Sequence, residues 1–80
     1  MASQFQFSDI KNKFAKMGTL SGLTQAEIVQ QVGLPNSVSS LPEGKKLLQW
    51  QHTSQAGAYH IALIFSHDDI CEGVSHEFST

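Results

Sequence analysis

Apolar side chains recur at helical spacing near the start of the chain. Ile10, Phe14 and Met17 are separated by four and three residues, which places them on one stripe of a helix. Ser8 is the expected N-cap and Gly18 the expected left-handed stop. The pattern predicts a short amphipathic helix over residues 8–17, preceded by an N-terminal arm of residues 1–7.

A second helix is predicted over residues 24–32. The sequence Thr-Gln-Ala-Glu at its start is a capping box. In that motif the Thr24 hydroxyl accepts from the backbone N–H of Glu27, and the Glu27 carboxylate accepts from the N–H of Thr24. Gly33 can end the helix and Pro35 prevents its continuation.

Apolar and polar residues then alternate in three stretches, 46–53, 58–65 and 70–78, which predicts three β-strands. In the middle stretch the two expected faces are Tyr59, Ile61, Leu63 and Phe65 on one side and His60, Ala62 and Ile64 on the other. In the last stretch Ile70, Val74 and Phe78 are expected to face the same way. Residues 34–44, rich in Ser and Pro, are expected to form a loop or an irregular edge strand.

The helices can bury their stripes only against the face that carries Trp50, Ile61, Leu63 and Phe65. We therefore predict an α+β fold in which two helices pack on one face of a three-stranded antiparallel sheet, in the order ααβββ. Residues 8–78 form the single domain, since 80 residues with 40% hydrophobic content allow one modest core.

Composition narrows the classes of partner and compartment. Five Lys, no Arg and a net charge of −2 argue against nucleic acid. No apolar run approaches the roughly 18 residues of a membrane helix, so no direct membrane insertion is expected. The single Cys71 and an N-terminus without signal-peptide character favour a cytoplasmic location for the chain as written. A periplasmic or outer-membrane location would require that a leader had been removed.

Several residues are candidates for metal binding or catalysis. His67, Asp68, Asp69 and Cys71 are acceptable zinc ligands by type, but no spacing of the paired-ligand kind accompanies them. Cys71 and His60 are expected to face each other on the outer side of the sheet, with no third group to orient a base. We therefore expect no catalytic residue, metal or cofactor. The alternative is a small metal-binding or hydrolytic protein that uses His60, His67 and Cys71.

The sheet face turned away from the helices is the expected binding surface. It should carry Gln49, Gln51, His60, Ala62, Ile64, Cys71, Gly73 and Ser75, with Asp68 and Asp69 in the adjoining turn. Such a face is flat and nearly uncharged, which suits a protein partner or self-association, for example as a homodimer. The alternative is a cytoplasmic inhibitor or immunity-type protein that binds through loops 54–57 and 66–69, where Asp68, Asp69 and Glu72 would mimic an anionic ligand.

The order of motifs resembles that of a known family. The motifs are Gly22-Leu23-Thr24-Gln25-Ala26-Glu27-Ile28, then Gly33-Leu34-Pro35-Asn36-Ser37, then Gly44 and Trp50, with Tyr59–Phe65 downstream. Together they resemble the SmpA/OmlA family of BamE-like outer-membrane assembly lipoproteins. The resemblance implies two helices on a three-stranded antiparallel sheet and a non-enzymatic protein-binding role. The lipobox Cys of the lipoprotein members has no counterpart near the start of this chain.

Overall fold

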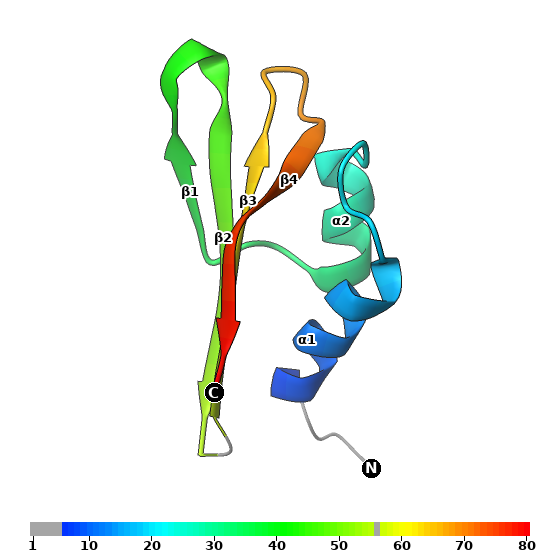
Figure 1. Ribbon diagram of the computed structural model, residues 1–80, viewed down its shortest axis with the longest axis vertical. Helices are drawn as coiled ribbons and strands as arrows, with labels where there is room; N and C mark the ends of the chain where they lie inside the picture. The colour runs from blue at the N-terminus through cyan, green and yellow to red at the C-terminus, as the bar shows by residue number, and fades with distance from the viewer. Residues whose placement is uncertain (1–5, 56) are drawn as a thin grey trace.

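A computed structural model describes residues 6–55 and 57–80 of the chain, which form two layers. One layer holds the helices α1 (Gln6–Met17) and α2 (Gln25–Val32). The other holds four strands, with a short 3-10 turn (Pro42–Gly44) between the first two. The strands are β1 (Ser37–Ser40), β2 (Lys46–Ser54), β3 (Gly57–Phe65) and β4 (Cys71–Ser79). Figure 1 shows both helices on one side of the sheet.

The sheet is antiparallel throughout, with strand order β1-β2-β3-β4, so the prediction of three strands is wrong by one. The extra strand comes from the Ser-rich stretch. Its backbone pairs Val38 with Leu48, and the Asn36 N–H donates to the Gln49 carbonyl at 2.7 Å. The fold class remains α+β. All four residues of the strand are exposed, so no alternation of apolar and polar residues marks it, and the sequence left both a loop and an irregular edge strand open for this stretch.

The predicted capping box is confirmed at the start of α2. The Thr24 hydroxyl accepts from the Glu27 N–H at 3.1 Å, and Glu27 Oε1 accepts from the Thr24 N–H at 2.8 Å. The helix ends at Gly33, whose φ of 93° is one that glycine adopts readily. In contrast, α1 begins at Gln6 rather than Ser8, so residues 6 and 7 of the predicted arm belong to the helix. Residues 1–5 of that arm lie outside the described residues.

The loop before α2 is tied to the start of β4 by backbone hydrogen bonds. The Gly22 N–H donates to the Cys71 carbonyl at 2.8 Å, and the Cys71 N–H donates to the Leu23 carbonyl at 2.7 Å. The Gln25 N–H donates to the Asp69 carbonyl at 2.8 Å. These bonds fix the entry to α2 against the β3–β4 turn.

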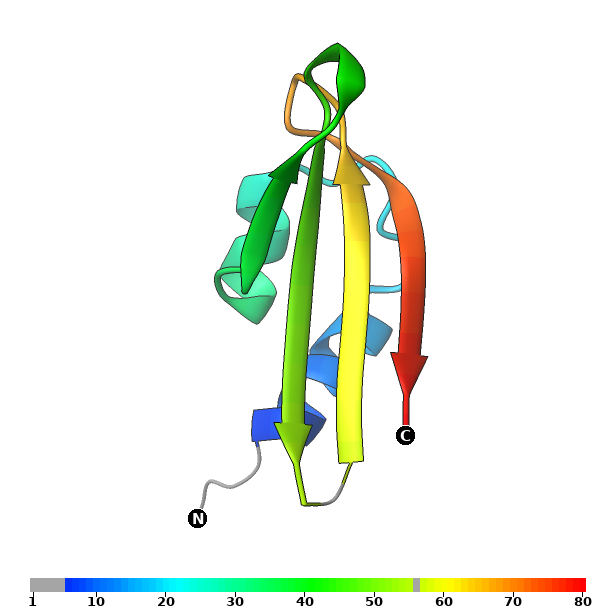
Figure 2. The same cartoon turned by 90° about the vertical axis from the view of Figure 1, so that its left-hand side faces the viewer.

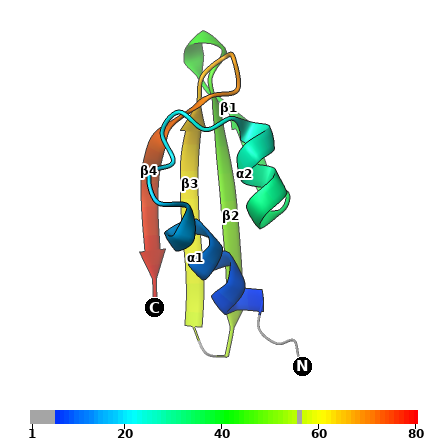
Figure 3. The same cartoon turned by 90° about the vertical axis from the view of Figure 1, so that its right-hand side faces the viewer.

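The core lies between the helices and one face of β2 and β3. The ring of Phe14 on α1 meets Trp50 edge-on, with centroids 5.3 Å apart, and the Trp50 indole N–H donates to the Gly33 carbonyl at 3.0 Å. The residues predicted to face the helices are all buried, namely Trp50, Tyr59, Ile61, Leu63 and Phe65, and Leu48 of β2 is buried beside them. Figure 3 shows α1 crossing β2 and β3, with β4 left at one side.

Two irregularities in β4 change which residues face the helices. The register with β3 shifts between Ala62 and Leu63 and again between Ile64 and Phe65. Each shift places an extra residue in β4 and reverses the alternation, as a β-bulge does. Val74 therefore pairs with Leu63 on the helix side, while Phe78 pairs with His60 on the opposite side. The prediction that Ile70, Val74 and Phe78 face the same way is wrong for this reason.

Candidate functional site

The helices leave one whole side of the sheet uncovered, and Figure 2 shows this side toward the viewer. We call it the outer face. Strand alternation and register assign to it Ser37, Ser39, Leu47, Gln49, Gln51, Thr53, Ala58, His60, Ala62, Ile64, His76 and Phe78. All of the residues predicted to bind through strands β2 and β3 are therefore on one surface, joined by two residues of β4.

Near the middle of the outer face, Gln49, His60, His76 and Phe78 form what we call the His60 cluster. Gln49 Nε2 donates to Ser37 Oγ at 3.3 Å, which leaves its Oε1 as acceptor for His60 Nε2 at 3.0 Å. In this amide orientation Nε2 carries the proton of the neutral His60 ring. The His60 ring lies edge-on to His76 and to Phe78, with centroid distances of 4.8 and 5.7 Å.

The outer face also carries apolar surface. Phe78 is 52% exposed, and Leu47 and Ile64 are half-buried on neighbouring strands. Ala62 lies between its cross-strand partners Gln49 and His76 and is fully buried, so its own side chain offers no surface to a partner.

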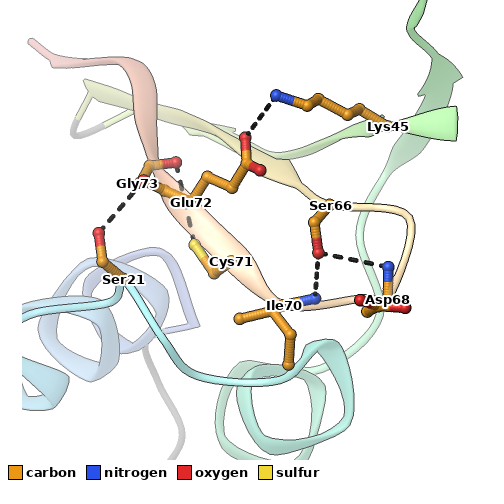
Figure 4. A network of polar contacts seen from close by, with 8 residues as sticks. All are labelled: Ser21, Lys45, Ser66, Asp68, Ile70, Cys71, Glu72 and Gly73. Carbon is orange, nitrogen blue, oxygen red and sulfur yellow. Dashed lines mark hydrogen bonds and ion pairs between the residues drawn. The ribbon is translucent and has the colours of Figure 1, made fainter. Parts of the chain in front are cut away.

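Charge on this side of the sheet is confined to one end. Among the described side chains, the charged ones there are Lys45 and Glu72, which pair with each other at 3.1 Å. Figure 4 shows the two meeting on the side of β4 opposite to Cys71 and the helices. The remaining charged side chains that the structure describes lie on the helices, on the helix side of the sheet or in the turns: Lys11, Lys13, Lys16, Glu27, Glu43, Lys46, Asp68, Asp69 and Glu77.

The structure does not bring Asp68 and Asp69 together with the rest of the predicted binding residues. Both lie in the β3–β4 turn, where Ser66 Oγ accepts from the N–H groups of Asp68 and Ile70, each at 3.3 Å (Figure 4). The Asp69 carboxylate forms an ion pair with Lys46, which also donates to Gln25 of α2 at 3.1 Å. This carboxylate therefore serves as a link between the turn and α2.

Cys71 faces the helices instead of the outer face, contrary to prediction. It pairs with Phe65 beyond the second register shift and is 2% exposed. Burial raises the pKa of the Cys71 thiol, which disfavours the nucleophilic thiolate. The sheet separates it from His60. The described residues contain no group of three His, Cys, Asp or Glu side chains placed to hold a metal ion.

Sequence reasoning missed that Phe78 lies exposed on the outer face. It also missed that the His76 ring lies edge-on beside His60. Both follow from the bulges in β4. Gly73, inside a predicted strand, was the available signal, because a glycine within a strand often marks a bulge. Its φ of 138° lies in a region that other residues avoid.

A surface hollow lies on the helix side, between α1 and α2. Its volume is about 540 Å³, and its lining includes Lys13, Lys16, Met17, Leu23 and Glu27. Among the described residues, no helix has the length and apolar content that crossing a bilayer requires.

Comparison of the chain with models of protein families, with curated proteins and with solved structures finds no match.

Proposed function

We propose that the protein is a non-enzymatic binding module that holds a partner protein through the outer face. The observation that carries this proposal is the contrast between the two sides of one small molecule. The helix side is rich in charged residues, whereas the outer face has one self-neutralising ion pair at its end and a half-exposed Phe78 on the edge strand β4, opposite His60. A solvent-facing antiparallel sheet usually carries charged side chains along its length and not at one end alone.

A nearly uncharged face with an exposed aromatic residue has the composition of an interface core. Such cores are depleted in charge and enriched in aromatic side chains, with polar groups at the rim. The His60 cluster supplies the aromatic and imidazole rings, and Lys45 with Glu72 supplies a charged rim. The carboxylates of the β3–β4 turn contribute less to the proposed interface, because Asp69 is paired with Lys46 of the same molecule.

Position-dependent photo-crosslinking tests the proposal. A photoreactive phenylalanine analogue replaces Phe78 in one variant and Val74 in a matched control. The two positions are 52% and 48% exposed on the same strand, but on opposite sides of the sheet. We expect a discrete adduct from position 78 and none from position 74 when the protein is irradiated in extracts of the cells that make it. Excess unlabelled native protein should suppress the adduct.

Equal adducts at both positions, or none at position 78, would overturn the proposed function. An adduct that the excess native protein leaves undiminished would also count against it, because a specific site saturates.

A further inference from the structure

We infer that the partner of the outer face is a second copy of the chain, packed face to face about a two-fold axis. This inference rests on the proposed function, since it names the partner of the same surface. In the resulting dimer the two sheets lie against each other and the helices lie on the two outsides, which is the arrangement of a sandwich of sheets.

The size of the molecule limits which of its surfaces can support a stable dimer. Its Cα extents are 42 × 19 × 18 Å. The long extent and one short extent therefore outline a face whose area is close to the ~800 Å² that each partner buries in a standard interface. Contacts along one edge or across half of the face would fall below that area. A stable dimer of this chain has to use a whole side, and the outer face is the side that the helices leave flat.

Electrostatics favour an identical copy. Apart from the mutually paired Lys45 and Glu72, the described side chains of the outer face are uncharged while the imidazoles are neutral. A two-fold axis brings like groups near like groups, so a face with net charge would repel itself. This face has no such penalty while its imidazoles are neutral.

Hydrogen-bonding groups on the face are also self-complementary. Gln51 carries both a donor and an acceptor, and Gln49 keeps one amide N–H and one lone pair of Oε1 beyond its bonds to Ser37 and His60. Each amide can therefore pair with the same kind of group from another copy. A face bearing only carboxylates or only ammonium groups would leave unsatisfied groups when two copies meet. The amides avoid that cost of burial.

The His60 cluster lies where a dimer would need its anchor. His60 and Ala62 flank Ile61, the middle residue of the nine-residue strand β3. The ion pair of Lys45 and Glu72 lies toward the end of the sheet. With a two-fold axis across the strands, the cluster of one copy meets the cluster of the other. Anchor residues of interfaces are typically aromatic. Phe78 is the exposed aromatic residue of this cluster, and it lies on the edge strand β4 opposite His60.

Light scattering across a concentration series, on the intact chain, tests the inference. The native protein should give a mass that rises from monomer to dimer. Phe78→Asp places a carboxylate on each outer face, and the two carboxylates come near each other in the dimer. We expect this variant to associate about 30-fold or more weakly. Val74→Asp is the matched control, because Val74 is similarly exposed on the helix side of the same strand, and it should associate like the native protein.

Gln51→Lys gives a second test that does not touch an apolar residue. Gln51 is exposed on the outer face, so the lysine should leave the fold intact and still oppose pairing. Far-ultraviolet circular dichroism confirms that each variant is folded.

A native protein that stays monomeric at high concentration overturns the inference, and so does a dimer that both outer-face variants leave intact. The crosslinking experiment separates this failure from that of the proposed function. A monomer that still gives an adduct of another mass at position 78 keeps the binding role and replaces the second copy by a different protein.

Discussion

At the scale of single residues, Tyr59 joins the core to the edge of the sheet. Its ring is buried, and its hydroxyl donates to Glu77 Oε2 at 2.6 Å. Burial, together with the hydrogen bond and the negative charge of Glu77, raises the pKa of this phenol far above its ordinary range. Tyr59 is the single tyrosine of the chain, so its ionisation can be followed without interference from others.

The raised pKa of Tyr59 predicts that the folded protein loses stability in a defined alkaline range. Tyr59 in the unfolded chain ionises near its ordinary pKa of about 10, whereas the folded protein keeps the proton. The favourable contribution to folding is therefore complete below about pH 10 and declines as the pH rises above it. We expect phenolate absorbance to appear only as the protein unfolds, and Tyr59→Phe should flatten the decline in the free energy of unfolding.

Glu77→Gln serves as the control for the carboxylate charge. It keeps an acceptor for the phenol but removes the charge, so phenolate should form at lower pH than in the native protein. Phenolate absorbance near pH 10 in the folded native protein would contradict the buried arrangement.

At the scale of elements, the α2 cap determines how the helix layer meets the β3–β4 turn. Thr24→Ala removes the acceptor for the Glu27 N–H, and we expect the free energy of unfolding to fall by about 1 kcal/mol. Thr24→Ser retains a hydroxyl and should lose much less. Urea unfolding measures both, and the midpoint should change without a change in slope. Equal losses in the two variants would show that the methyl group, and not the cap, is responsible.

The elements that sequence predicted well are those specified by their own side chains. The capping box at Thr24 and the inward stripe from Tyr59 to Phe65 depend on local hydrogen bonding and on burial, and both are visible in the pattern of residues. Strand β1 is specified differently, by backbone pairing with β2, in which serine serves as well as valine. No periodicity can reveal such a strand.

On the outer face, too, the sequence predicts some positions correctly and others wrongly. Gln49, Gln51 and His60 were placed correctly because β2 and β3 pair without irregularity. Cys71 and Phe78 were placed on the wrong sides because two bulges in β4 reverse the alternation, and strict alternation is the assumption on which the prediction depended. The candidate site was therefore half predictable, and the missing half contains its most exposed aromatic residue.

At the scale of the whole molecule, the distribution of charge makes the proposed dimer sensitive to any charge added to the outer face. His60 and His76 lie with ring centroids 4.8 Å apart. They face Gln49 and Gln51 of β2 and Phe78 of β4, and the described carboxylate on this side, Glu72, is already paired with Lys45.

Charge added at these two positions should therefore separate the two copies. The double variant His60→Lys with His76→Lys places two positive charges on each face, and four meet across the two-fold axis, so light scattering should show weak association. The double variant His60→Gln with His76→Gln adds no charge and should associate like the native protein. His67→Lys adds a charge in the exposed β3–β4 turn, outside the outer face, and should leave association unchanged. A lysine double variant that associates like the native protein would place the two imidazoles outside the contact between the copies.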